Sequence, residues 1–332
     1  MKTLDRLWER GQQFLGTRFA ILGGAMTWVS DAHLVSAISN GGGFGVLASG
    51  AMDPVLLQQA IIQTQSLTSQ PFGVNLITMN PYLFDLMDVC GQYNVSHVVL
   101  AGGMPSKTMI QHLKSLNCRV IAMAPTEKLA MHLVRFGVDA LIVEGHEAGG
   151  HVGPIATSVL AQDVLMAVKG HVPVFVAGGI GRGEMIGAYL KLGAAGCQLG
   201  TRFVCTHECQ AHENFKEAFI QAQSKDAILS PQLDPMFPVI PVRGLNNEGT
   251  QQFLKTQQEA IHDYRQNRCS QKEAQLRIEK FWAGALRRAV QEGDVVHGSV
   301  MAGQSVGMIK SIEPCIEILE SLTQQACQYV ES

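Results

Sequence analysis

The sequence predicts a (β/α)8 barrel, on three observations. Eight short apolar runs rich in β-branched residues recur through the first 200 residues, and stretches with helical periodicity lie between them. The runs start mostly 21–29 residues apart, with one longer step of 32 residues. Continuous apolar strands that alternate with helices indicate βαβ units in a parallel sheet covered on both faces. Eight such units favour a closed barrel over an open sheet. The predicted strands are residues 18–22, 44–48, 72–76, 97–101, 119–123, 140–144, 172–177 and 196–200.

Helices are predicted where apolar periodicity ends at a glycine. Residues 31–41, 126–137 and 182–193 follow this pattern, and glycine is the usual residue just past a helix end. Residues 313–330 are amphipathic as well, and they would supply the closing helix of the barrel.

Residues 203–290 depart from the barrel pattern. They contain a helical stretch, a proline-rich loop and charged helices from residue 249 onward. An insertion after the eighth strand would lie at the carboxyl-terminal mouth of the barrel, where caps and lids belong. We therefore predict two domains, a barrel formed by residues 1–202 and 291–332 and an inserted helical lid or substrate subdomain formed by residues 203–290.

Composition excludes several classes of protein. The chain has 332 residues, is 46% hydrophobic and 16% charged, and carries a net charge of −3, which indicates an ordinary globular protein rather than a nucleic-acid-binding one. No apolar run reaches the ~18–20 residues of a membrane span. The first residues include Asp5 and Glu9 and lack the apolar segment of a secretory signal. Eight scattered cysteines favour a reduced, cytoplasmic protein.

Glycines follow the seventh and eighth predicted strands at the edge where barrel enzymes keep their active sites. Gly178 and Gly179 follow the seventh strand, and Gly200 and Thr201 follow the eighth. Backbone N–H groups exposed at these two adjacent loops favour a phosphate site. The spacing of glycines beyond Gly179 lacks the full dinucleotide fingerprint and follows the wrong strand, so a Rossmann fold is not expected.

Amide side chains are predicted deeper in the same mouth. Asn75 ends the third strand and Gln198 lies in the eighth. Together with a phosphate site they suit a flat heterocycle with a phosphate tail, and flavin mononucleotide (FMN) fits that description. Met26, after the first strand, is expected to pack against the ring.

The stretch EGHEAGGHVG, residues 144–153, raises the possibility of a metal site. His146, His151, Glu144 and Glu147 have no defined ligand spacing, however, so we expect no metal there. The run CTHECQAH, residues 205–212, superficially resembles a zinc cluster, but its ligands are too close in sequence and it is typical of a helix start.

Several motifs together identify a family resemblance. They are GGAMTWV, PFGVN, GMPSK, EGHEAGGHVG, VFVAGGI, CQLGTRFVCTHECQAH, GALRRAVQEGD and GSVMAGQ. From about residue 18 to its end the chain resembles the FMN-dependent enoyl-acyl-carrier-protein reductase II group, which is nested among the nitronate monooxygenase (2-nitropropane dioxygenase) flavoproteins. EAGGH and GTRF are shared across the superfamily, whereas GALRRAVQEGD with GSVMAGQ resembles the reductase branch.

The resemblance implies a (β/α)8 barrel with one FMN at its carboxyl-terminal mouth and an active-site histidine at His151. The implied FMN contacts are Gly24, Ala25, Met26, Asn75, Gly149, Gly150, Gly178, Gly179, Gln198, Gly200 and Thr201. The chain departs from the reductase pattern after the first strand, where Gly23 and Ala25 stand in place of Gln and Gly. Residues 230–247 depart as well, and we expect this segment to shape the substrate entrance.

The resemblance also implies a reaction, the reduction of trans-2-enoyl thioesters by NADH or NADPH in fatty-acid or polyketide biosynthesis. His151 would donate the proton or hold the thioester carbonyl. The alternatives are a nitronate monooxygenase, in which His151 is the base, an NAD(P)H:quinone reductase, and a flavin-binding protein without turnover, against which the intact EAGGH argues. We expect a homodimer and an acyl group carried by acyl carrier protein or coenzyme A. Lys107, Arg243, Arg287 and Arg288 would form a basic face for an acidic carrier, although scattered solvated charges are the default interpretation.

Overall fold

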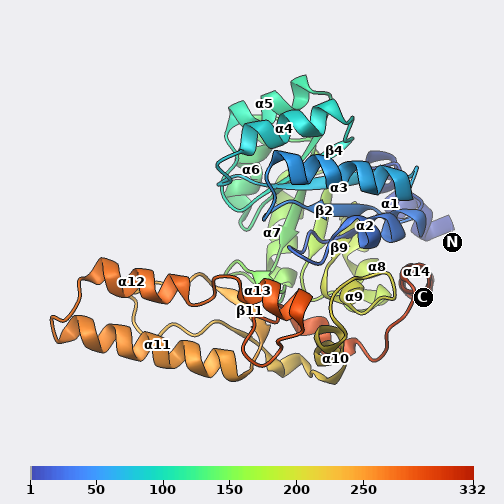
Figure 1. The fold of residues 1–332 in the computed structure, drawn as a ribbon. Helices are drawn as coiled ribbons and strands as arrows, with labels where there is room; N and C mark the ends of the chain where they lie inside the picture. Colours follow the sequence, from blue (N-terminus) through green and yellow to red (C-terminus); the bar gives the residue numbers. More distant parts are fainter. Residues whose placement is uncertain (1) are drawn as a thin grey trace. The chain divides into compact units, whose positions relative to one another are not determined.

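The computed structural model describes residues 2–332, which form two compact units (Figure 1). The barrel unit comprises residues 2–146, Gly153–Gln210 and Ser311–Ser332, and the helical unit comprises Glu147–Val152 and Ala211–Lys310. Within residues 2–332, no helix combines the length and the apolarity that crossing a membrane requires.

The barrel unit confirms the predicted (β/α)8 barrel. Eight parallel strands form one sheet in the order β1-β9-β8-β6-β5-β4-β3-β2. The two ends of this sheet meet at a parallel bridge between Leu22 and Phe44, where the Phe44 N–H donates to the Ile21 carbonyl at 2.9 Å. Each predicted run overlaps one strand. The strands are β1 (Ile21–Gly23), β2 (Gly45–Ala48), β3 (Phe72–Ile77), β4 (His97–Ala101), β5 (Arg119–Met123), β6 (Ala140–Glu144), β8 (Val174–Ala177) and β9 (Gly196–Leu199).

Helices between the strands cover the barrel, and side-chain caps start several of them. Asp31 accepts from the backbone N–H groups of His33 and Leu34, and Thr126 accepts from Leu129, which satisfies donors that a helix leaves unpaired. The helices are α2 (Ala32–Asn40), α3 (Pro54–Leu67), α4 (Leu83–Gln92), α5 (Lys107–Ser115), α6 (Glu127–Phe136), α7 (Thr157–Val168), α8 (Gly183–Lys191), α9 (Thr201–Val204) and α14 (Cys315–Glu331).

An additional helix, α1 (Lys2–Leu15), packs against the interior of the barrel. It was not predicted from the sequence. Its last residue, Leu15, is fully buried in the barrel core with Leu22, Phe44 and Phe175. The carbonyl of Phe14 accepts a hydrogen bond from Nε2 of His97 at 2.9 Å, so α1 is tied to β4 by a buried polar contact.

The helical unit has its own core and its own small sheet. The sheet has the order β10-β11-β7, all antiparallel, and its third strand comes from the segment that follows β6. In Figure 1, α11 and α12 run side by side, drawn in orange, and their apolar faces surround Phe253 and Ile278. The elements are β7 (Gly150–His151), α10 (Glu213–Gln221), β10 (Ala227–Leu229), β11 (Val242–Leu245), α11 (Glu248–Arg265), α12 (Gln271–Lys280), α13 (Ala285–Arg287), a π-helix (Arg288–Glu292) and two 3-10 turns (Ser224–Asp226 and Gln304–Met308).

The bounds of the two units differ from the predicted insertion at 203–290. Residues 203–210 stay with the barrel unit, where Thr206 pairs with Glu313. Residues 291–310 belong to the helical unit, where the Leu245 N–H donates to the Val300 carbonyl at 2.8 Å. Residues 147–152 join the same unit through β7.

Buried His97 predicts how the stability of the barrel depends on pH. Burial lowers the pKa of its imidazole to about 4, from about 6.5 in the unfolded chain. Between these pH values the unfolded state binds more protons, so the free energy of unfolding should rise by up to about 3 kcal/mol as pH rises from 4 to 6.5. Denaturant titrations across this range measure the effect. His97→Gln, which cannot gain a proton, should flatten this dependence, and an unchanged slope in that variant would contradict the assignment.

Candidate functional site

The loop after β1 lies against the loop after β9 in the barrel mouth. The Gly24 N–H donates to the Leu199 carbonyl at 2.8 Å, and the Ser30 hydroxyl donates to the Gly24 carbonyl and accepts from the Met26 N–H. A Cβ at Gly200 would lie 3.3 Å from the sulfur of Met26. The absence of a side chain at position 200 therefore lets Met26 lie directly over the end of β9. Ala25 packs against the barrel core.

The loop after β8 requires glycine. Gly178 and Gly179 have φ angles of +97° and +71°, which side-chain-bearing residues rarely adopt. A Cβ at Gly178 would lie 2.9 Å from the hydroxyl oxygen of Thr157 and 3.1 Å from the Gly145 carbonyl oxygen. The next loop round the barrel carries Gly200 and Thr201 at the start of α9. Small residues therefore follow both strands.

The two predicted amide side chains are buried in the same sheet, on strands that β2 and β1 separate. Asn75, 7% exposed, lies in β3, and its Nδ2 donates to the Val99 carbonyl at 3.1 Å. Gln198, 8% exposed, lies in β9 between Leu22 and Ala177. A side-chain amide that is largely buried at this end of the barrel can bind the polar ring atoms of a ligand, since it carries both a donor and an acceptor.

Glu144 adds an acidic group at the carboxyl end of β6. Desolvation raises the pKa of its carboxyl group to about 7. Near neutral pH this group is partly protonated, so it can donate a hydrogen bond as well as accept one. Glycine loops, a buried amide and a neutralised carboxyl group at one end of the barrel fit a flat heterocycle with a phosphate tail. Within the described chain, no three His, Cys, Asp or Glu side chains lie close enough together to hold a metal ion.

Gly149, Gly150 and His151 belong to the helical unit and are held there by backbone contacts. In the register of the small sheet Gly150 lies opposite Arg243 and His151 opposite Val242. The backbone of Gly149 packs so closely on residues 302 and 303 that a Cβ there would lie 2.6 Å from the Gly303 nitrogen. Two glycines are needed, one for this close approach and the other for a φ angle of +76° at Gly150.

Further hydrogen bonds fix both ends of the same segment. The Gln304 N–H donates to the Glu147 carbonyl at 2.9 Å, and the Val152 N–H donates to the Pro241 carbonyl at 3.2 Å. The position of His151 is therefore set by β11 and by the chain around residue 303, both within the helical unit.

Arg243 supports this segment from inside the unit. It is only 4% exposed, and one guanidinium nitrogen donates to the Ala227 carbonyl at 2.6 Å. Burial lowers the pKa of the guanidinium, while the nearby Glu147 carboxylate opposes that shift. The expectation that Arg243 contributes to a basic surface is therefore wrong, because its guanidinium is buried and hydrogen-bonded inside the unit. A charged side chain can be buried when it is paired in this way.

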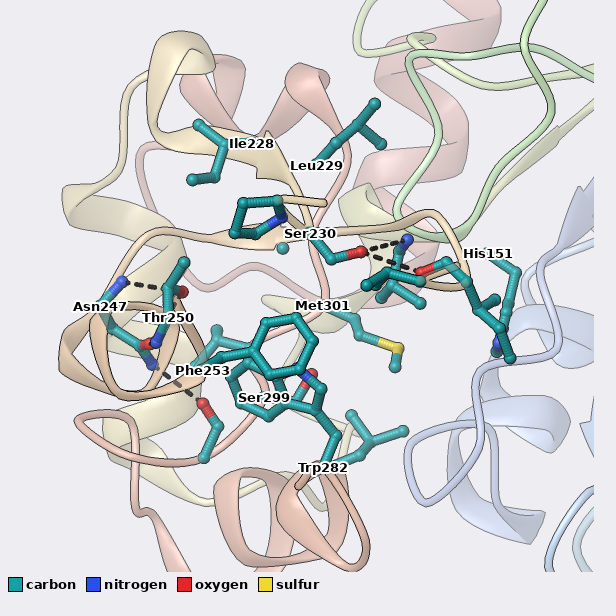
Figure 2. A pocket seen from close by; sticks show the side chains of 18 of the residues that line it. His151, Ile228, Leu229, Ser230, Asn247, Thr250, Phe253, Trp282, Ser299 and Met301 are labelled. Carbon is teal, nitrogen blue, oxygen red and sulfur yellow. Dashed lines mark hydrogen bonds between the residues drawn. The ribbon is translucent and has the colours of Figure 1, made fainter. Parts of the chain in front are cut away.

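His151 lines an apolar cavity of about 360 Å³ within the helical unit. Figure 2 shows His151 at one side of it and Asn247 and Thr250 at the other, with Met301 and Phe253 between them. This volume falls within the range of about 300–1,000 Å³ typical of small-molecule sites. A predominantly apolar cavity with an imidazole at one side can hold a hydrophobic molecule and present one reactive polar group to it.

Burial favours the neutral form of the His151 imidazole. Burial lowers its pKa from the usual range, although the residue as a whole stays exposed. Near neutral pH the ring therefore carries one N–H and one lone pair, so that it can donate a hydrogen bond to a carbonyl oxygen or accept a proton.

Comparison with known proteins assigns the chain to a family. The family model of nitronate monooxygenase matches residues 9–93 and 81–325. The chain belongs to the nitronate monooxygenase family. Its members and relatives are flavin-dependent oxidoreductases, and this chain is an oxidoreductase of the same kind.

The proteins similar to this chain carry the names of different enzymes. The structure of FabK from Thermotoga maritima superposes with a TM-score of 0.87 and 35% identity, with 97% of each chain covered. A (3aS,4S,5R,7aS)-5-hydroxy-7a-methyl-1-oxo-octahydro-1H-indene-4-carboxyl-CoA dehydrogenase from Mycobacterium tuberculosis is 30% identical, with 96% of each chain covered. A probable nitronate monooxygenase from Staphylococcus haemolyticus is 30% identical over 73% of this chain and 80% of its own.

The cavity was not predicted from the sequence. Its lining comes from β10, β11, α11, the end of α12 and residues 298–301, which are distant in sequence. Two signals pointed to parts of it, the unusual segment 230–247 and the motif GSVMAGQ, which contains Met301. Neither pattern shows that the two segments share a cavity with His151.

The side-chain amide of Gln198 gives a test of flavin binding in this family member. Gln198→Leu should weaken FMN binding roughly 3- to 10-fold, the effect of losing one hydrogen bond. The free energy of unfolding of the flavin-free protein should change little, because leucine keeps a side chain of similar size in β9. Quenching of FMN fluorescence measures the binding, and Gln59→Leu on the exposed face of α3 is the control. Unchanged affinity with lower stability would contradict this role.

Proposed function

We propose that this protein reduces the double bond of trans-2-enoyl thioesters, with FMN held by the barrel unit and NADH or NADPH as the source of hydride. The observation that supports this most strongly is the apolar cavity with His151 on its wall. An acyl thioester has an apolar tail and a carbonyl group next to the reacting double bond. The cavity suits the tail, and His151 suits the carbonyl.

The barrel residues have binding roles in this proposal. Gly178 with Gly179, and Gly200 with Thr201, would hold the phosphate, because small residues leave the backbone accessible there. Gln198 and Asn75 would bind polar edges of the ring, and Met26 would pack on it. When bound, FMN would supply a centre that takes hydride from the nicotinamide and gives it to the β-carbon of the enoyl group.

His151 acts on the thioester. Its neutral imidazole donates a hydrogen bond to the carbonyl oxygen, where negative charge develops as hydride reaches the β-carbon. The lowered pKa keeps a proton-bearing but uncharged ring in place at neutral pH. Of the two roles expected from the sequence, holding the carbonyl therefore fits better than donating the proton, and the proton at the α-carbon would come from water.

Nitronate monooxygenase activity is the second candidate, and the same lowered pKa favours it. A neutral imidazole is a base, so His151 would remove the proton next to a nitro group, and oxygen would be the oxidant. A small nitroalkane would fill little of a 360 Å³ cavity, which is why we rank this reaction below thioester reduction. A quinone reductase is a third possibility for the same scaffold.

The remaining parts of the proposal concern the surroundings of the enzyme. We propose a cytoplasmic homodimer that receives its substrate on acyl carrier protein or coenzyme A. Arg243 is buried and therefore does not belong to a basic face for the carrier.

Anaerobic half-reactions distinguish the candidate functions. Under the proposal, NADH or NADPH bleaches the flavin quickly, and enoyl thioesters restore its colour. Bleaching by a nitronate and not by a nicotinamide would establish the monooxygenase instead. Restoration by quinones alone would establish the quinone reductase.

His151 variants test the residue itself. His151→Ala should slow flavin reoxidation by an enoyl thioester roughly 100- to 1,000-fold, the effect of removing one donor to a developing oxyanion. Flavin content and the rate of bleaching by nicotinamide should change little. Stopped-flow absorbance measures both rates, and near-normal reoxidation in the variant would overturn the role of His151.

The pH profile tests which form of the imidazole works. Since imidazolium also donates a hydrogen bond to the carbonyl oxygen, kcat/KM for enoyl reduction should hold as pH drops through the lowered pKa of His151, whereas a fall would show that the ring acts as a base. His151→Gln keeps a donor that does not titrate, so it should retain part of the activity with the same pH dependence. Activity that rises as pH falls would instead show that imidazolium donates the proton.

A further inference from the structure

We propose that the cavity beside His151 takes an unbranched hydrocarbon tail and that an aromatic wall formed by Phe253 and Trp282, with Phe281 packed against both, sets the chain length. This inference rests on the proposed thioester reduction and specifies where the tail of the substrate lies. Figure 2 shows Phe253 and Trp282 on the wall between His151 and the far side of the cavity.

The charges around the cavity exclude the phosphate-bearing parts of the substrates as its occupant. Among the described residues, no Lys or Arg lines it, and its only titratable side chains are His151 and the exposed Glu279. A nicotinamide dinucleotide, a coenzyme A head group or a phosphopantetheine arm carries phosphate, which needs cationic or backbone donors and would be repelled by Glu279. The occupant is therefore an uncharged, apolar group.

Hydrogen bonding in the lining favours a plain hydrocarbon over an oxygenated ring system. Asn247 Nδ2 donates to the carbonyls of Val295 and Gly298, and its oxygen accepts from Thr250. The Ser230 hydroxyl donates to the Ile240 carbonyl and accepts from the Val242 N–H. A ring bearing hydroxyl and keto groups would give up its water here and meet polar groups that are already paired. Ser299 alone adds a further hydroxyl to the lining.

The aromatic wall is part of the packed core of the unit. The ring centroids of Phe253 and Trp282 are 5.5 Å apart, those of Phe253 and Phe281 are 5.2 Å apart, and those of Phe281 and Trp282 are 4.9 Å apart. Phe253 and Ile278 are buried in the same core. Close-packed rings yield little to a longer ligand, so the wall defines a maximum length rather than a flexible surface.

The cavity of about 360 Å³ lies within the size range of small-molecule sites, so a chain of four carbons would leave most of the space empty. A chain long enough to reach Phe253 and Trp282 could become longer only by moving these rings.

The test is the dependence of kcat/KM on acyl length for enoyl-coenzyme A substrates of four, eight, twelve and sixteen carbons with the flavin-loaded enzyme. In the wild type, kcat/KM should rise roughly fourfold for each methylene buried and then level off or fall, before sixteen carbons, once the chain reaches the wall. Trp282→Ala should move that break toward sixteen carbons and raise kcat/KM for the longest substrate at least 10-fold relative to the shortest. Trp282 is only half-buried, and Trp282→Phe provides a milder change in case the alanine variant folds poorly.

Leu276→Ala is the matched control, since Leu276 is exposed on α12 and does not line the cavity. It should leave the break where it is in the wild type. A break that stays in place in both Trp282 variants, or a flat dependence on length in the wild type, overturns the assignment of the wall while thioester reduction stands. Failure to reduce any enoyl substrate, including the four-carbon one, instead overturns the proposed function.

Discussion

The pairing of β7 with β11 is the constraint on which the proposed chemistry depends. Two residues, Gly150 and His151, form a strand of the small sheet, opposite Arg243 and Val242. This short strand lies in a segment that leaves the barrel after β6 and returns to it six residues later. The backbone of Gly149 packs against residue 303, and buried Arg243 lies beneath with Glu147 nearby. The backbone that carries His151 is therefore fixed in position, and residues of the same small sheet line the cavity beside it.

The two units divide the work of the proposed reaction. The barrel unit offers features for binding a cofactor, namely glycine turns, the amide of Gln198 and the partly protonated Glu144. The helical unit offers an apolar cavity and an imidazole kept neutral by burial. Barrels commonly keep one binding end and vary the segments attached to it, which is consistent with relatives of one family that carry the names of a reductase, a dehydrogenase and a monooxygenase.

The barrel strands were predictable because each is a short apolar run buried on both faces, and that pattern is local. The small sheet was not predictable, since Gly150 and His151 are too short a strand to show alternation and β10 and β11 flank a proline-rich loop. Helix α1 was not expected because the barrel repeat begins at its first strand and requires no helix before it, although Leu4, Trp8 and Leu15 recur at helical spacing. Arg243 looked like a surface cation because the sequence does not show the carbonyl of Ala227 and the carboxylate of Glu147 that accompany it inside. The loop glycines and Gln198 were placed at the barrel mouth by strand order alone, whereas the cavity depends on segments that meet only in the folded chain.

The central claim is that the acyl chain lies in the cavity of the helical unit beside His151. Photo-crosslinking tests it most directly, with a saturated dodecanoyl thioester that carries a diazirine at the end of its chain and peptide mapping by mass spectrometry. We expect labels on the aromatic wall and its neighbours, at Phe253, Ile278 or Trp282, and loss of these labels when unmodified dodecanoyl thioester competes. Competable labels confined to the barrel unit would contradict this claim.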